Sequence, residues 1–495
     1  MFNKKQTFLS TTLGLAGAVG LATPSLATTL EGYATLNGGT TGGQGGSVVY
    51  ATTGTEINEA MCNRATVDTP LIIYVSGTIN HDNTEQISGN CDTTGEEIQF
   101  KRVSNISLIG TGSGALFDEI GIHIRESSNI IIQNVHVRNV KKSGTPTSNG
   151  GDAIGMEKDV FNIWVDHNTL EASGGESDGY DSLIDMKNTT QYVTVSYNHL
   201  YFSGRGGLMG SSDSDATNTY VTFHHNWYDT IDSRMPLLRH GTAHAYNNYY
   251  LNVSKSAMNP RIGGSIKAEN NHFENVNDPI GTFYTEDMGY WDVSGNIFEN
   301  VTWDAEDSTT HPAGPDPVST TTITIPYSYQ LDDADCVRSI VTAAAGADNG
   351  LLESDGSCST DGGSSTGDSG STDLGSNLSI GAGSDGSSKG VGSYGSVRDG
   401  DMSTYWAPSG ATGRISIKWS SAQTINTIII REASGYEGNI GAWTVVNNDT
   451  GDTLASGSGA GTITFSDVGL NKVNFNITSS SGTPTVAEFE TYNAQ

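Results

Sequence analysis

The chain has 495 residues, of which 62 are glycine and 16% are charged, with 24 lysines and arginines against 55 aspartates and glutamates. This length exceeds that of one ordinary domain, and a glycine-rich, weakly charged composition favours β structure with many turns over helical bundles. The formal net charge of −31 argues against nucleic acid or an anionic membrane as a partner, because a polyanion would be repelled.

Residues 1–27 have the pattern of a secretory signal peptide. Lys4 and Lys5 precede an apolar run from about Leu13 to Ala22, and the triplet "SLA" ending at Ala27 supplies the small residues of a cleavage site. Beyond this segment, the sequence has no stretch long enough to span a membrane. We therefore expect a secreted, extracellular protein whose first domain starts at residue 28.

The four cysteines, Cys62, Cys91, Cys336 and Cys358, indicate two disulfides in an exported chain. Three pairings are possible, and we favour the two local ones, Cys62 with Cys91 and Cys336 with Cys358. The sequence contains no CxxC motif and no cysteine–histidine cluster that would suggest zinc.

Seven segments in the middle of the chain alternate apolar residues and then carry an asparagine: Asn134, Asn168, Asn198, Asn226, Asn248, Asn271 and Asn296. Counted between successive asparagines, the gaps are 34, 30, 28, 22, 23 and 25 residues. A recurrence of this length with β periodicity predicts a parallel β-helix, an all-β fold. We expect the asparagines at the corners, because asparagine tolerates left-handed backbone angles, and stacked in a ladder of amide hydrogen bonds.

The remainder of the chain changes character twice. Residues 359–376, "STDGGSSTGDSGSTDLGS", have the composition of a flexible linker between the β-helix domain, residues 28–358, and the tail. Residues 377–495 contain short alternating segments such as "RISIKW" and "KVNFNI" and predict a separate β-sandwich.

Three aspartates are placed to share one surface of the coil. Asp181 and Asp185 are four residues apart in a strand-like stretch and so point to one face, and Asp152 lies about one coil earlier. A hard, oxygen-loving cation such as Ca²⁺ would relieve their mutual repulsion. The alternative is a set of solvated acids on an acidic protein.

Arginines follow on the next coils. Arg205 lies in "FSGRGGLMGSS", whose glycines leave room for a ligand, and Arg234 and Arg239 flank Pro236, which fixes the backbone between them. An acidic patch followed by an arginine patch favours a polyanionic chain, bridged by a metal ion, as the ligand.

Several motifs occur together and in order: "VSGTI", "NIWVDHN", "DSLIDMK", "VTVSYNHL", "GLMGSSDSD", "VTFHHNWYD" and "SRMPLLRHGTAHAYNNYY". On these motifs the chain from about residue 30 to 350 resembles a pectate lyase of the family-1 polysaccharide lyases. The resemblance implies a right-handed parallel β-helix with an asparagine ladder.

The resemblance also implies roles for the residues singled out above. Asp152, Asp181 and Asp185 would hold Ca²⁺, Arg234 would take the C5 proton of a galacturonate, and Arg205 and Arg239 would bind its carboxylate. Lys187, on the face of Asp185, is a further candidate for substrate contact, with a structural role as the alternative. The implied reaction is β-elimination on polygalacturonate of plant or algal cell walls by a monomeric enzyme.

Two positions depart from the family's pattern. Arg205 stands where many relatives have lysine, and its planar guanidinium can still grip a carboxylate in bidentate fashion. Gly150 stands where some relatives carry a further acid, which would weaken the metal site.

Other functions remain open at this point. A pectin lyase acting on methylated chains would not need the aspartates, and a hydrolase would need paired carboxylates but not the arginines. A non-catalytic β-helix that only binds cell-wall polysaccharide is the alternative outside enzymology.

In the tail, "VRDGDMSTYWAP" (397–408) resembles discoidin-like modules of the coagulation-factor type C fold, with Asp399, Asp401, Thr404 and Trp406 matching its signature. These residues tend to be structural in that fold. We expect a carbohydrate-binding module, because a second site would raise the effective substrate concentration.

Overall fold

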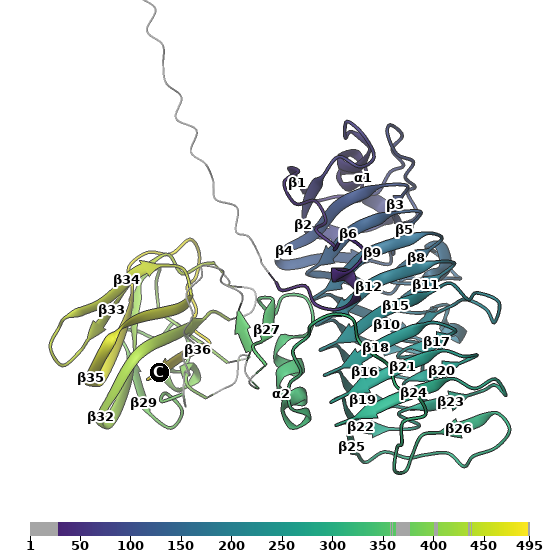
Figure 1. Cartoon of the computed structure of the whole chain (residues 1–495). Coiled ribbons are helices and arrows are strands. Elements are labelled where there is room, and N and C mark those ends of the chain that lie inside the picture. Colours follow the sequence, from purple (N-terminus) through teal and green to yellow (C-terminus); the bar gives the residue numbers. More distant parts are fainter. Residues whose placement is uncertain are drawn as a thin grey trace, which may run out of the picture. The chain divides into compact units, whose positions relative to one another are not determined.

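The computed structural model describes residues 28–356, 358, 360–362, 377–399, 404–433, 436 and 438–493. The predicted signal peptide, Asp401 and most of the predicted linker lie outside these residues. The chain divides into two compact units, Met1–Ser365 and Thr366–Gln495, and among the described residues each unit has its own hydrophobic core (Figure 1).

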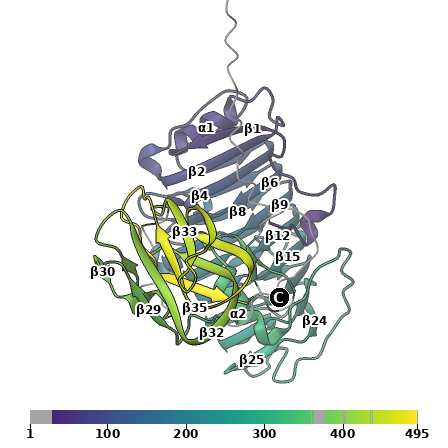
Figure 2. The same ribbon diagram turned by 90° about the vertical axis from the view of Figure 1, so that its left-hand side faces the viewer.

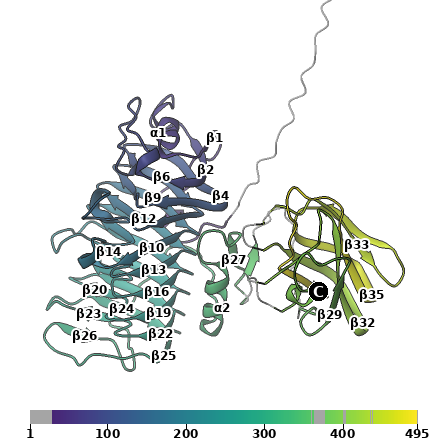
Figure 3. The same cartoon turned by 180° about the vertical axis from the view of Figure 1, so that it is seen from behind.

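The first unit is a parallel β-helix, as predicted, in which most coils contribute three strands. The first column of strands contains β1 (Ser47–Ala51), β2 (Leu71–Ile79), β4 (Ser104–Asp118), β6 (Ser128–Gln133), β9 (Val160–Asp166), β12 (Thr190–Ser196), β15 (Thr219–His224), β18 (Thr242–Tyr246), β21 (Ser265–Glu269) and β24 (Tyr290–Ser294). The second column, seen from behind in Figure 3, contains β7 (Val135–Arg138), β10 (Thr169–Gly174), β13 (His199–Ser203), β16 (Trp227–Ile231), β19 (Tyr249–Val253), β22 (His272–Val276) and β25 (Ile297–Glu299).

The third column is a separate seven-stranded sheet that carries the predicted site residues. It contains β3 (Ile98–Lys101), β5 (Ile122–Arg125), β8 (Ile154–Glu157), β11 (Ile184–Lys187), β14 (Gly207–Met209), β17 (Leu237–Arg239) and β20 (Asn259–Arg261), all paired in parallel.

Alternation of side chains along each strand fills the interior of the coil. Residues at the same position on successive rungs stack, and an aromatic column shows this plainly. The rings of Tyr228, Tyr250, Phe273 and Phe298 follow one another with centroids 4.8, 4.6 and 5.3 Å apart. The rung spacing of a parallel sheet therefore sets the spacing of the core.

Six of the seven predicted asparagines form the expected ladder: Asn168, Asn198, Asn226, Asn248, Asn271 and Asn296. From Asn168 to Asn271, each Nδ2 donates to the Oδ1 of the next asparagine at 2.9–3.0 Å. Each backbone N–H donates to the same oxygen at 2.9–3.0 Å. The ladder thus satisfies buried polar groups at a corner where the strand hydrogen bonds are interrupted.

The predicted reason for these asparagines was wrong for the six ladder residues. The left-handed angle belongs to the residue before each of them: His167, Tyr197, His225, Asn247, Asn270 and Gly295, with φ between 47° and 66°. Asn134 occupies this preceding position, with φ 56°, because Gln133 pairs with Asp166. Asn134 is therefore level with His167 and lies outside the ladder.

One helix covers an end of the first unit, a second helix packs against its side, and two disulfides cross-link it. Helix α1 (Gly54–Cys62) lies beside β1 and β2 at one end of the stack (Figure 2). Both favoured disulfides are present, Cys62–Cys91 and Cys336–Cys358. Helix α2 (Ala334–Ala344) packs Val337 and Val341 against Tyr249 of β19.

Short strands complete the first unit. The antiparallel pairs are β23 (Gly281–Phe283) with β26 (Thr310–Pro312) and β27 (Leu352–Ser354) with β28 (Thr360–Gly362). Residues 360–362, predicted as linker, therefore belong to a strand, because their backbone pairs with the segment before Cys358.

The second unit is an antiparallel β structure, also visible in Figure 2. Its main sheet contains β29 (Gly383–Gly386), β32 (Gly413–Arg431), β33 (Ala442–Asn447), β34 (Thr453–Ser458), β35 (Gly461–Ile477) and β36 (Glu488–Tyr492), and β30 (Val391–Gly392) pairs with β31 (Trp406–Ala407). Trp406 is fully buried and donates to the Ser388 carbonyl, and Thr404 donates to Asp399 at 2.9 Å. These signature residues have structural contacts.

No helix within the described part of the chain has the length and apolar character required to cross a membrane.

Candidate functional site

Neighbouring rungs of the third column bring the predicted site residues together. Asp152 lies two residues before β8, Asp185 lies in β11, and Arg239 ends β17. Arg205 and Arg234 lie in the loops that enter β14 and β17. Since β8, β11, β14 and β17 pair in this order, the aspartates and arginines follow one another along one face.

Each of the three aspartates has a cation of the chain as partner. Lys187 Nζ lies 2.8 Å from Asp152 Oδ2 and 2.9 Å from Asp185 Oδ2. Asp181 pairs with Arg205 at 2.7 Å and with Lys142 at 3.0 Å. Lys187 thus serves as a counter-ion of the aspartates in this structure, which is the structural role considered as the alternative to substrate contact.

Two carboxylates of this cluster are buried, so their negative charges need a compensating positive charge nearby. Asp152 is 5% exposed and Asp185 is 1% exposed. Burial, followed by the charge of Asp185, raises the pKa of Asp152 well above its usual range, although Lys187 acts in the opposite direction. The two carboxylates raise the pKa of Lys187 in spite of its own burial. The site therefore strongly favours a positive charge between the carboxylates.

The donor set fits a hard divalent cation. It consists of carboxylate oxygens only, and Asp152 Oδ1 is buried with no hydrogen-bond partner among the described residues. A Cβ at Gly150 would lie 3.1 Å from Asp152 Oδ2, so an acid at position 150 would extend this set. With glycine at position 150, the predicted site has three aspartates as its acids: Asp152, Asp181 and Asp185.

Of the glycines around Arg205, Gly204 lines the cleft described below, whereas Gly206 and Gly207 serve the packing of the coil. A Cβ at Gly206 would lie 2.6 Å from the Arg234 carbonyl oxygen, and one at Gly207 would lie 1.9 Å from the Ile184 carbonyl oxygen. These glycines let the rungs approach each other, and they do not open space for a ligand.

A cleft of about 450 Å³ lies beside the arginines, and its lining includes five cations: Arg205, Arg234, Arg239, Lys255 and Arg261. The chain as a whole is strongly acidic, so this is a marked local inversion of charge. Such a cleft attracts anionic ligands.

Arg261 was missed in the sequence. It pairs in register with Arg239 on the next rung and is 8% exposed. Its distance of 22 residues from Arg239, equal to one coil gap in this region, is the signal that could have identified it.

The arginines in the cleft differ in how they are held. Arg239 donates to the Gly210 carbonyl at 2.7 Å and to Asp213 at 3.0 Å. Arg234 has a left-handed backbone, φ 67°, and makes no ion pair with any described residue. Burial and neighbouring Arg205 lower its pKa, and burial and Arg239 lower the pKa of Arg261 to about 10. Arg261 also makes no ion pair with a described residue, and its Nε is buried without a hydrogen-bond partner among them. Arg234 and Arg261 are thus the two cleft arginines that can pair with a ligand.

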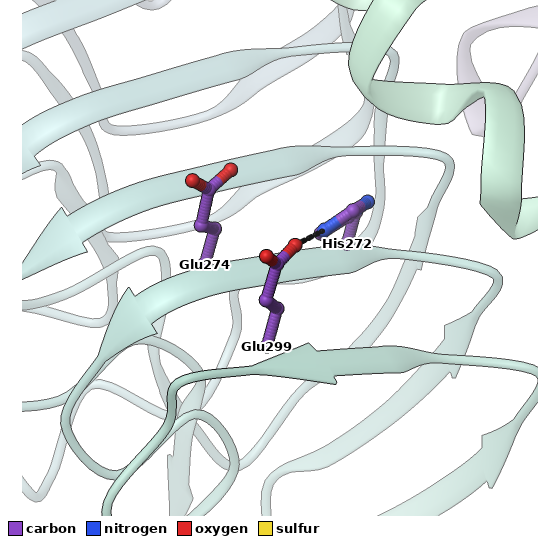
Figure 4. A group of neighbouring side chains, drawn as sticks. All are labelled: His272, Glu274 and Glu299. Atoms are coloured by element: carbon purple, nitrogen blue, oxygen red, sulfur yellow. Dashed lines mark hydrogen bonds and ion pairs between the residues drawn. The ribbon is translucent and has the colours of Figure 1, made fainter.

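A second cluster lies away from the cleft, on β22 and β25. Figure 4 shows His272 and Glu299 pointing toward each other, with Nε2 3.3 Å from Oε2, and Glu274 beside them. Glu274 already accepts from Tyr249 at 2.6 Å and pairs with Arg338 of α2 at 3.1 Å. These contacts attach α2 to the coil.

Comparison with known proteins gives a consistent result. A family model described as pectate lyase matches residues 7–350. A pectate trisaccharide-lyase of Bacillus licheniformis is 43% identical over 318 residues, which cover 64% of this chain and 86% of that protein.

Solved structures agree in fold. A pectate lyase from Bacillus sp. N165, in complex with trigalacturonate, is 34% identical with a TM-score of 0.55, and the match covers 65% of this chain and 99% of that one. Pectate lyase C from Erwinia chrysanthemi, solved with Ca²⁺, is 28% identical with a TM-score of 0.57, covering 67% of this chain and 100% of that one.

Proposed function

The chain belongs to the pectate lyase family and degrades pectate, and on this premise we propose that it cleaves polygalacturonate by Ca²⁺-dependent β-elimination, releasing 4,5-unsaturated oligogalacturonates. The observation that carries the proposal is the juxtaposition of buried aspartates with an arginine-lined cleft on adjacent rungs. Relatives solved with trigalacturonate and with Ca²⁺ support it.

In this proposal Asp152, Asp181 and Asp185 hold Ca²⁺. When bound, the ion neutralises a galacturonate carboxylate and so makes the neighbouring C5 hydrogen more acidic. The unpartnered Oδ1 of Asp152 is the first donor available to it. Binding of Ca²⁺ changes the contacts that these carboxylates now make with Lys187, Lys142 and Arg205.

The arginines carry the rest of the chemistry. Arg239 and Arg205 bind substrate carboxylate through charge-assisted hydrogen bonds. Arg234 takes the C5 proton, and the electron pair left on C5 forms the 4,5 double bond as the bond from C4 to the glycosidic oxygen breaks. The departing oxygen keeps the electrons of that bond and takes a proton from water. Burial and the positive charges of Arg205 and Arg239 lower the pKa of Arg234, and this favours the neutral guanidine that can accept the proton.

The test follows ultraviolet absorbance of unsaturated products during incubation with polygalacturonate, with and without a Ca²⁺ chelator. We expect absorbance to rise and to stop rising on chelation. An increase in absorbance that is the same with the chelator and is larger on esterified pectin would instead indicate a pectin lyase. Reducing ends without absorbance would assign a hydrolase, and no change would leave a binding protein.

The same assay tests Arg234. Arg234→Ala should lose about 10²- to 10⁴-fold in turnover, the usual contribution of a positioned base. Arg102→Ala is the matched control, because Arg102 is an exposed partner of Glu126 outside the cleft lining. Turnover close to that of the unaltered enzyme in Arg234→Ala would remove Arg234 from catalysis.

We further propose that the enzyme is secreted after cleavage behind Ala27 and acts as a monomer, and that residues 377–495 bind carbohydrate. Intact-mass measurement of the exported protein checks the cleavage, and light scattering checks the oligomeric state. Sedimentation with insoluble cell-wall polysaccharide, compared between the full chain and a chain ending at residue 365, checks the tail.

A further inference from the structure

A second groove continues from the arginine cleft toward the second column of strands. Its volume is about 630 Å³, and its lining includes Phe202 and Thr230 together with Glu171 and Ser173. It shares Gly175, Gly204 and Asp232 with the arginine cleft. A polysaccharide that lies in the cleft can therefore extend into this groove without leaving the surface.

Phe202 has a left-handed backbone, as Tyr197 and Tyr220 do elsewhere in the coil. Its φ is 51°, in the left-handed region, and its side chain is 54% exposed. The register places it level with Thr230, Asn252 and Asn275 on the next three rungs, whose φ values are 53°, 56° and 55°. Asparagine suits this angle, whereas a bulky aromatic residue is strained there.

Neither backbone conformation nor core packing accounts for this phenylalanine. Asparagine at this level supports the coil, because Asn275 donates to Asn252 at 3.3 Å. Phe202 forgoes such a bond and exposes its ring in the groove instead. The ring of Tyr201 meets it edge-on at 5.1 Å and fixes its orientation. An aromatic ring that is exposed in a groove joined to a ligand cleft points to binding.

The charge of the groove selects the kind of sugar. Its described lining contains no arginine or lysine, in contrast to the five cations of the cleft. Its two acids have partners outside the lining, since Glu171 faces His136 at 3.7 Å and Asp232 pairs with Lys255 at 3.0 Å. The carboxylate of an ionised galacturonate finds no counter-ion in this lining, whereas a neutral sugar unit needs none and can stack its apolar face on an aromatic ring.

We propose that Phe202 is a specificity-determining residue that binds a neutral, methyl-esterified galacturonate unit of the same chain whose ionised unit lies in the arginine cleft. The proposal rests on the function proposed above. Partly esterified pectin is then a substrate of this enzyme. The groove accepts esterified units, whereas the cleft excludes them because its arginines bind a free carboxylate.

The test compares Phe202→Asn with the unaltered enzyme on polygalacturonate and on half-esterified pectin, by absorbance of unsaturated products. Asparagine is what two of the next three rungs carry, so the variant should unfold at the same temperature or higher. We expect KM on half-esterified pectin to rise about 2- to 10-fold, the usual value of one aromatic contact. The kcat on both substrates and the KM on polygalacturonate should not change.

Two controls sharpen the result. Phe202→Tyr keeps the ring and should keep the KM of the unaltered enzyme, and Thr230→Ala changes the next rung without removing an aromatic surface. An unchanged KM ratio between the two substrates in Phe202→Asn, or an equal rise on both, would overturn the proposal. If the unaltered enzyme releases no unsaturated product from either substrate, the function proposed above fails and this proposal falls with it.

Discussion

At the scale of single residues, the carboxylate of Asp278 gives the stability a pH dependence that can be measured. It is 4% exposed and accepts the backbone N–H of Asp304 at 2.9 Å. Burial, with the nearby Asp304 carboxylate as a further cause, raises its pKa from 3.8 to about 6. The folded state therefore retains a proton that the unfolded state has already lost between about pH 4 and pH 6, and the free energy of unfolding falls as the pH rises through this range.

Asp278→Asn keeps an oxygen acceptor for Asp304 and removes the charge. Near pH 4 the variant and the unaltered protein should be about equally stable, and near pH 7.5 the variant should be more stable by about 2–3 kcal/mol. Denaturant unfolding at both pH values measures the difference. A difference that is the same at both would show that Asp278 does not titrate in this way.

Single residues also show what sequence reasoning could reach at the site. The repeat length predicted that Asp152 and Asp185 lie on adjacent rungs, and they do, before β8 and in β11. Strand alternation does not apply to Asp181, because this residue lies three positions before β11 begins. The counter-ions depend on side-chain reach and loop shape, so the double contact of Lys187 and the pairing of Lys142 with Asp181 could not be derived from spacing.

At the scale of the elements, the asparagine ladder is the feature whose loss should cost most. Asn226 Oδ1 accepts two bonds from Asn198, and its Nδ2 donates to the Val195 carbonyl and to Asn248. All of these groups are buried, and a buried donor or acceptor without a partner costs about 1–3 kcal/mol.

Asn226→Ala should therefore destabilise the first unit by about 3–6 kcal/mol. Asn296→Ala, at the partly buried end of the ladder, is the matched control and should cost less. Urea unfolding of the two variants makes the comparison. Equal losses would mean that the ladder does not act as a continuous chain of buried bonds.

The arrangement of the strands also explains why the sequence revealed the repeat but wrongly assigned Asn134 to the ladder. An asparagine after a β-like segment marks the ladder at Asn168 and the left-handed position at Asn134 alike, since both sites accept that residue. Only the register, in which Gln133 pairs with Asp166, separates them. Loop lengths set this register, and they vary from coil to coil.

At the scale of the whole molecule, two separate cores imply two folding units. The first core contains residues such as Val195 and Tyr250, and the second contains Trp406, Phe475 and Phe489. Calorimetry of the full chain should show two transitions, and a chain ending at residue 365 should keep the first of them and its kcat/KM on soluble polygalacturonate. Loss of both transitions together, or of activity, on removing the second unit would contradict this independence.

The uneven length of the coils has a practical consequence for protein engineering. Rungs joined by the asparagines differ in length from 22 to 30 residues, yet the first-column strands β9, β12, β15, β18, β21 and β24 stay paired one after another. The added residues lie at the two other corners of the coil, at 175–183 between β10 and β11 and at 210–218 between β14 and β15. Loops between the third and first columns can therefore be varied in length without disturbing the ladder. Those between the second and third columns must keep Asp181, Arg205 and Arg234.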